Sequence, residues 1–196
     1  MFLDSVGIIL RKNNLSRYKI VILDKIQGKI ECVTLINSLS PGALIAYNIR
    51  EKNVTNFISD SELLYLPLSL AQTDMLFFHH VLELVYYFTE IGSCSNEVFD
   101  ILAFLYSTFL SAMTIQSKKL FLLKLLTSTG SIPELNTHYS HYIMHLSTID
   151  IKQLVTMTID ISYEKELDKW LWCCVQQHPY ANEFKTVHFL AQNRTL

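Results

Sequence analysis

Residues 18–23, YKIVIL, are the stretch that decides the fold class. Four of these six residues are β-branched or aromatic, which is the composition that favours a strand. Residues 24–28, DKIQG, follow directly, and Gly28 can adopt the positive φ that a tight turn needs. The sequence therefore predicts a strand that turns sharply into a second strand.

Further short strands are expected on both sides of this stretch. Residues 6–10 form an apolar, β-branched run, residues 29–36 alternate loosely, and residues 43–50 follow the turn signal NSLSPG. Residues 54–58 complete the series. Five short strands joined by tight turns predict a small closed barrel, because an open sheet of this size would leave its edges exposed.

Helical spacing of apolar residues replaces the strand pattern after residue 60. We expect a long helix over residues 69–91, and others over 96–109, 115–128, 150–157 and 164–178. A polar, histidine-containing loop is expected over residues 136–145. The predicted class is therefore α+β, with a five-stranded barrel over residues 1–62 followed by an all-α helical domain over residues 63–196.

The composition is apolar, with 50% hydrophobic and 17% charged residues, so a membrane location must be considered. The most apolar stretch, residues 75–88, is shorter than the roughly 20 residues of a spanning helix and contains His79, His80 and Glu83. The first residues lack the basic and apolar regions of a secretory signal. None of the four cysteines forms a CxxC pair. We expect a cytoplasmic protein with reduced cysteines and no membrane association.

The chain carries no recognised catalytic signature, and we expect neither an enzyme nor a bound cofactor. It has no GxSxG motif and no glycine-rich phosphate loop, and Cys173 and Cys174 lie in a predicted amphipathic helix. His138, His141 and His145 could meet one metal ion if they lay on a helix, but no carboxylate base accompanies them. We predict no metal site. A histidine-bearing loop is the preferred interpretation, and a histidine-metal enzyme is the less favoured one.

Positive charge is concentrated in the first third of the chain. Residues 1–60 carry eight basic and five acidic side chains, whereas residues 61–196 carry eight basic and thirteen acidic ones. Cations and an aromatic ring at the turns of a small barrel suit nucleic-acid binding, with charge for phosphates and stacking for bases. A solvated sheet edge would give the same pattern. The candidate nucleic-acid-binding residues are Arg11, Lys12, Arg17, Tyr18, Lys19 and Lys29.

Three segments, in this order along the chain, resemble the bacterial recombination mediator RecO family. The first comprises residues 6–10, VGIIL, and 17–23, RYKIVIL, which resemble the start of the family's barrel. The second, residues 121–135, FLLKLLTSTGSIPEL, resembles its Phe-Glu-x-Arg-Leu-Leu…Gly…Pro-Glu-Leu segment, with Leu122 in place of the acid. The third is residues 178–190, HPYANEFKTVHFL, which resembles the closing His…Lys-Ser…Phe-Leu.

The sequence departs from the family pattern in two places. Many members carry a four-cysteine zinc module where residues 136–141 read NTHYSH, and a second ligand pair is missing here. A structural zinc site needs four ligands, so none is predicted. The family's basic loop after the third strand is shortened to residues 37–42, NSLSPG, without a cation.

The resemblance implies a role in recombinational repair. RecO proteins bind single- and double-stranded DNA through an oligonucleotide-binding (OB) barrel, anneal complementary strands, and join RecR to load RecA onto strands coated by single-strand-binding protein. Their helical domain docks the acidic C-terminal tail of that protein. The resemblance thus predicts an OB-like barrel here and a bacterial, nucleoid-associated location.

For the tail, an apolar groove with a cationic rim is expected on the helical domain. Its candidate residues are Lys118, Lys119 and Lys124, which could equally be solvated lysines of an amphipathic helix. An alternative function is a protein–protein interaction scaffold that keeps the fold but has lost DNA binding, as the shortened loop suggests.

Overall fold

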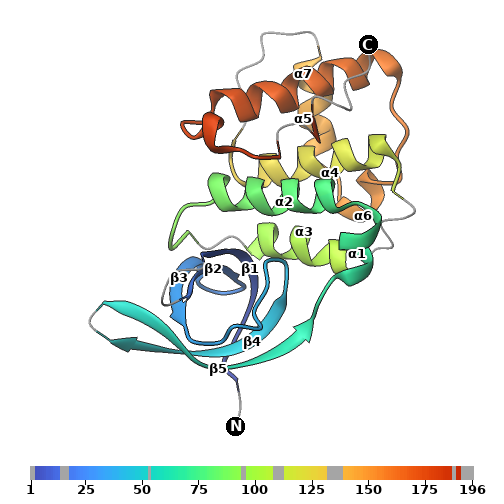
Figure 1. Cartoon of the computed structure of the whole chain (residues 1–196). Helices are drawn as coiled ribbons and strands as arrows, with labels where there is room; N and C mark the ends of the chain where they lie inside the picture. Colours follow the sequence, from blue (N-terminus) through green and yellow to red (C-terminus); the bar gives the residue numbers. More distant parts are fainter. Residues whose placement is uncertain are drawn as a thin grey trace.

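The computed structural model describes residues 3–13, 18–52, 54–93, 96–107, 113–131, 139–186 and 189–190. Its first part is a closed five-stranded barrel with the strand order β1-β2-β3-β5-β4 (Figure 1). The β3 and β5 strands run parallel, and the other neighbours are antiparallel. The predicted α+β class with an OB-like barrel is confirmed. The strands are β1 (Ser5–Asn13), β2 (Tyr18–Asp24), β3 (Gly28–Thr34), β4 (Leu44–Lys52) and β5 (Thr55–Tyr65).

The barrel interior is built by the two-residue period of its strands. Ile20 and Ile22 of β2 point inward and pack with Ile9, Ile45 and other buried residues. Tyr47 is the polar exception, and its hydroxyl donates to Asp24 Oδ2 at 2.6 Å. The other oxygen of Asp24 accepts from the backbone N–H groups of residues 26 and 27, which fixes the β2–β3 turn. Burial and this hydrogen bond raise the pKa of Tyr47.

The β1 and β2 strands are buried on their outer face as well. Ile8, Leu10, Val21 and Leu23 point away from the interior and belong to the core of the helical domain. They pack beneath α2 (Met75–Phe88), which lies against β1. Strands buried on both faces read as continuous apolar runs, which explains the pattern of residues 6–10.

The helices follow the barrel and form a body above it in Figure 1. At their centre is α4 (Ile115–Ser128), which contacts α2, α3, α5, α6 and α7. Most of α4 from Leu120 to Leu126 is inaccessible to solvent, as expected for a helix apolar on most sides. The other elements are α1 (Leu68–Thr73), α3 (Asn96–Ser107), α5 (Ser140–Thr148), α6 (Ile151–Leu154), α7 (Ile161–Gln177) and the 3-10 helix η2 (Ala181–Glu183).

Three helical predictions differ from the structure. The helix expected over 150–157 is only the four residues of α6. The expected single helix over 69–91 is divided into α1 and α2 at Asp74, whose carboxylate caps α2 by accepting from Phe77 N at 2.9 Å. The expected loop over 136–145 contains the start of α5, where Ile143 and Leu146 are buried one turn apart. Within the described residues, no helix is long and apolar enough to cross a membrane.

The described part of the C-terminal segment, residues 178–186 and 189–190, packs back against α2. His80 of α2 is fully buried, and its Nδ1 lies 2.9 Å from Thr186 Oγ1. Thr186 gives its hydroxyl proton to Glu83, so His80 Nδ1 must be the protonated donor. Its Nε2 has no hydrogen-bond partner among the described residues, and burial lowers the pKa of His80 to about 3.

Gly42 sets the distance between the barrel and α2. Its N–H donates to Ile9 O at 2.7 Å, and its carbonyl accepts from the Tyr106 hydroxyl at 2.9 Å. Its φ is +82°, and a Cβ at this position would lie 2.3 Å from the Phe78 ring. A side chain at residue 42 therefore meets both backbone strain and an aromatic ring of α2.

We predict that Gly42→Ala lowers the free energy of unfolding by about 2–5 kcal/mol, from the strained φ and the clash with Phe78. Gly92→Ala is the matched control, because Gly92 has φ +77° and open space around its Cβ position. The Gly92→Ala change should lower the free energy of unfolding by only about 1–2 kcal/mol. Urea unfolding of both variants measures the difference. Equal losses would contradict the close approach of Phe78.

Folding stability should also depend on His80 at mildly acidic pH. The unfolded chain binds a proton at this histidine near pH 6.5, whereas the folded chain does so only near pH 3. The protein therefore keeps its full stability above pH 6.5. As the pH falls toward 3, protonation of His80 in the unfolded chain lowers the free energy of unfolding by up to about 4 kcal/mol. Urea unfolding between pH 7 and 5 should show a shallower decline for His80→Asn than for the unchanged chain. Parallel curves for His80→Asn and the unchanged chain would refute this role of His80.

Candidate nucleic-acid interface

Three segments of the barrel meet at one end, which we call the loop end. Tyr18, the first residue of β2, pairs with Thr34, the last residue of β3. Cys32 pairs with Asn56 near the start of β5, and Lys52 pairs with Thr55 at the tip of the β4–β5 hairpin. The start of β2, the end of β3 and this hairpin are thus neighbours. The hairpin projects from the side of the barrel (Figure 1).

A groove of about 670 Å³ runs along the loop end between the end of β3 and the start of β5. Val33, Leu35 and Phe57 give it apolar walls, and Lys52 lies at its margin. Leu35 is 81% exposed, and Val54 at the hairpin tip is 94% exposed. Val54 also has φ +62°, which costs energy for a β-branched residue and is a feature of functional loops. Apolar and aromatic surface is therefore accessible at this end.

Besides Lys52, which lines the groove, two lysines lie on the neighbouring β1 and β2 strands. Lys12 donates to Asn37 O at 2.6 Å, and its ammonium lies 4.4 Å from the centroid of the Tyr18 ring. Lys19 is 58% exposed and forms a 3.6 Å ion pair with Glu31. The structure therefore brings together three of the predicted residues, Lys12, Tyr18 and Lys19. Arg17, between β1 and β2 in sequence, lies outside the described residues.

Sequence reasoning missed Arg50, Lys52 and Phe57. Arg50 and Lys52 are exposed on the β4–β5 hairpin and have no ion-pair partner among the described residues. The sequence signal for these two cations was the run REK at residues 50–52. This run lies just before the turn of the β4–β5 hairpin, a loop at which OB barrels contact ligands. The wall residue Phe57 resembles any other apolar strand residue in sequence.

Arg11 and Lys29 lie away from the loop end, at the contact between the barrel and α2. The Arg11 guanidinium lies 4.8 Å from the centroid of the Tyr86 ring. Lys29 donates to the Tyr86 carbonyl at 2.7 Å and is only 9% exposed. Burial lowers the pKa of Lys29. Lys29 therefore joins β3 to α2 and does not face solvent.

The three lysines predicted for a partner surface make contacts within the helical domain. Lys118 pairs with Asp74 at 2.6 Å, and Lys124 lies 2.9 Å from Ser147 O and 3.2 Å from Glu97. Lys119 is 2% exposed and pairs with Glu164 and Asp168 of α7 at 2.7 and 2.8 Å. Lys119 therefore holds α4 to α7 from inside the domain, and the three do not form an open cationic rim.

The histidines considered for a metal site do not gather in the described part of the chain. His141 and His145 are exposed one turn apart on α5, while His138 lies outside the described residues. No group of three metal-ligating side chains occurs among the described residues. Burial raises the pKa of Cys32 to about 12 and also raises that of Cys174, so both thiols are protonated at neutral pH.

The comparisons with known proteins add no family or relative. No protein-family model matches the chain. The search of curated proteins also gives no match. The fold and the geometry of the loop end are therefore the basis for any functional proposal.

We predict that Lys119→Met destabilises the protein by about 3–5 kcal/mol, because it removes the buried ammonium that neutralises the carboxylates of Glu164 and Asp168 at the edge of the core. Lys169→Met is the control: Lys169 pairs with Glu166 at the surface, and its loss should cost less than about 1 kcal/mol. Chemical denaturation gives both values. A small loss for Lys119→Met would show that this lysine is not structural and would return it to the candidate partner surface.

Proposed function

We propose that the chain binds single-stranded DNA at the loop end and serves as a RecO-like mediator of recombinational repair. One observation carries the proposal: an OB-like barrel brings exposed cations, an aromatic wall and a groove to one end. Five-stranded barrels of this kind bind oligonucleotides on the face of their second and third strands and at the adjoining loops. The groove and the cations occupy the corresponding place here.

The chemistry of the loop end suits a flexible single strand. Phe57 and Tyr18 offer aromatic surface to bases, and every base has a face that can stack. Lys12, Lys19, Arg50 and Lys52 can neutralise phosphates, while Glu31 and Glu51 reduce the local charge. Up to four phosphate contacts give a slope of log affinity against log salt of about −3. Binding should therefore be moderate and strongly dependent on salt.

The wider role rests on the resemblance of residues 6–10, 17–23, 121–135 and 178–190 to the RecO family. It comprises binding of double-stranded DNA, strand annealing, association with RecR, and loading of RecA onto strands coated by single-strand-binding protein. None of these steps requires catalysis by this chain. Because Lys118, Lys119 and Lys124 make internal contacts, a docking site for the acidic tail would use other residues of the helical domain.

A protein–protein interaction scaffold is the second candidate function. Its support is a concentration of exposed apolar side chains where β5 passes into the helices. Leu63 is 54%, Leu68 59% and Met75 58% exposed, and Leu64 and Tyr65 are exposed beside them. Exposed apolar surface of this kind often marks a contact with another protein.

Fluorescence anisotropy with a labelled oligothymidine of about 20 nucleotides tests the proposal across a salt series. The triple variant Lys19→Glu, Arg50→Glu, Lys52→Glu should weaken binding at least about tenfold. The control triple, Lys152→Glu, Lys165→Glu, Lys169→Glu, makes the same change of charge on exposed helical residues and should bind nearly as the unchanged chain. Undetectable binding at low salt, or equal loss in both triples, would favour the scaffold.

A further inference from the structure

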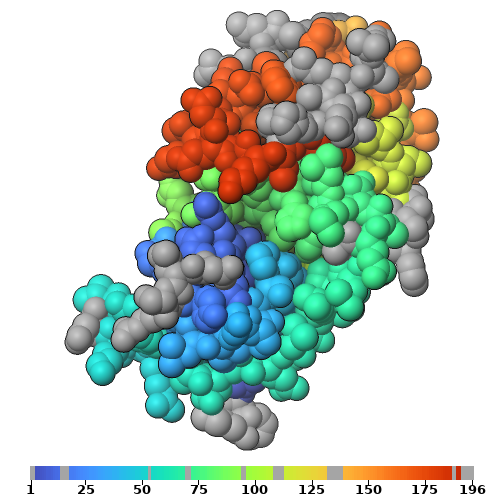
Figure 2. Space-filling model, viewed as in Figure 1, coloured from blue at the N-terminus to red at the C-terminus, as the bar shows by residue number. Residues whose placement is uncertain are grey.

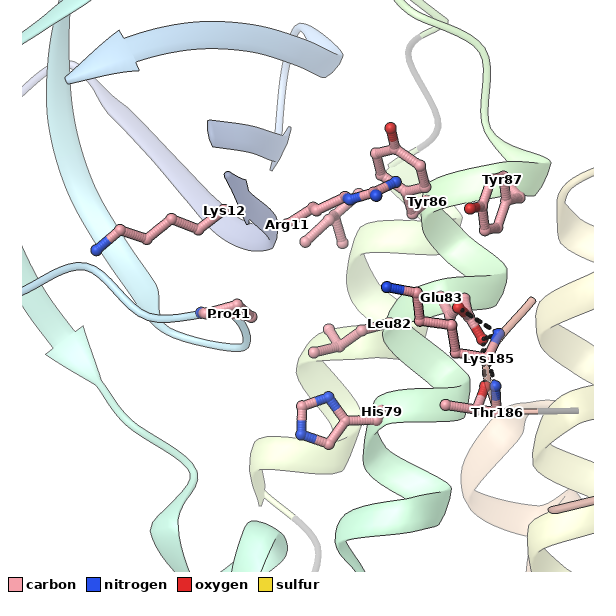
Figure 3. Close-up of a pocket in the computed structure, with 11 residues that line it drawn as sticks. Arg11, Lys12, Pro41, His79, Leu82, Glu83, Tyr86, Tyr87, Lys185 and Thr186 are labelled. Carbon is pink, nitrogen blue, oxygen red and sulfur yellow. Dashed lines mark hydrogen bonds between the residues drawn. The ribbon is translucent and has the colours of Figure 1, made fainter. Parts of the chain in front are cut away.

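A second cavity, which we call the seam pocket, lies between the barrel and α2 and has a volume of about 330 Å³ (Figure 3). The β1 strand forms one wall, α2 forms the floor, and residues 185 and 186 of the C-terminal segment close the far side. The space-filling view shows how the barrel forms a separate lobe beneath the helical body (Figure 2). With Pro41, which precedes β4, the seam pocket is thus formed by four separate parts of the chain.

The charge of the seam pocket is positive. Arg11 and Lys185 extend toward it from opposite sides in Figure 3. Among its described lining residues, Glu83 is the only acid, and its carboxylate accepts hydrogen bonds from the Lys185 and Thr186 backbone N–H groups at 2.9–3.0 Å. The Thr186 hydroxyl donates to the same carboxylate. Glu83 therefore has its acceptors occupied, whereas the two cationic heads remain available to an anion.

Arg11 is held in place before any ligand arrives. Its guanidinium lies against the face of Tyr86, and Lys29 approaches the same ring at 5.3 Å. A planar guanidinium fixed by stacking presents paired N–H donors that match the oxygens of a phosphate. Fixing the group in advance reduces the entropy lost on binding.

The remaining wall is apolar and suits a flat ring. Leu10, Pro41 and Leu82 line it, and the exposed imidazole of His79 stands at its edge. The volume is at the lower end of the range of about 300–1,000 Å³ found for small-molecule sites. A ligand of this size with an anionic group and a flat, partly apolar body is a single nucleotide.

We propose that the seam pocket binds one nucleotide, with its phosphate at Arg11 and Lys185 and its base against Leu82 and His79. In the protein's biological setting, the bound nucleotide belongs to a single DNA strand that continues from the loop end; this part of the inference rests on the proposed function. Lys12 connects the two sites, because it contacts Tyr18 and Asn37 at the loop end and also lines the seam pocket.

Isothermal titration of the full chain with deoxyadenosine 5′-monophosphate tests the proposal. The nucleotide should bind, deoxyadenosine should bind more weakly, and inorganic phosphate should compete. Lys185→Met should reduce nucleotide affinity about tenfold or more through the loss of a charged contact. It keeps the backbone hydrogen bonds to Glu83, so folding should be preserved, and urea unfolding checks this. Lys165→Met, at an exposed position on α7, should leave nucleotide affinity unchanged.

The outcomes separate this inference from the proposed function. Nucleotide binding that survives the triple change at Lys19, Arg50 and Lys52, while strand binding is lost, supports a separate seam pocket. Strand binding without nucleotide binding, and with no effect of Lys185→Met on strand affinity, overturns the seam pocket and leaves the proposed function standing. An acidic peptide that binds in a Lys185-dependent manner when the nucleotide does not bind also overturns it.

Discussion

The packing of α2 on the outer face of β1 and β2 is the contact on which the rest of the molecule depends. The side chains of Ile8 and Leu10 point out of the barrel, opposite to that of Ile9. They pack in the helical core beneath Phe78 and Leu82. The barrel therefore cannot turn relative to the helices without exposing apolar surface to water. This rigid contact places Arg11 beside Tyr86 and leaves the loop end pointing away from the helical body.

A second constraint acts inside the helical domain, where Lys119 sits among apolar side chains. The desolvated ammonium is offset by two carboxylates of α7, which must be within hydrogen-bond distance for the charge to be tolerated. These two ion pairs therefore fix the position of α7 along α4. Apolar contacts supply most of the free energy that packs α7 against α4, and the ion pairs select one relative position of the two helices.

The barrel could be predicted from sequence because strand period and turn chemistry are local properties. The division at Asp74 was missed, because one acid within an apolar run does not reveal that its side chain will cap a helix. The candidate interface could be predicted in part, because Lys12, Tyr18 and Lys19 flank a recognisable turn. Lys29 looks the same in sequence, yet α2 covers it. Which outer face of a strand is covered depends on elements more than fifty residues away, so alternation alone could not place it.

The closing contact of the C-terminal segment with α2 has a consequence for synthesis on the ribosome. The barrel strands emerge first, and the apolar outer face of β1 and β2 stays uncovered until α2 has followed. The carboxylate of Glu83 meets its hydrogen-bond donors later still, because residues 185 and 186 are translated more than a hundred residues after it. The seam pocket can therefore form only after residue 186 has left the ribosome, and a nascent chain stalled before residue 185 lacks that wall.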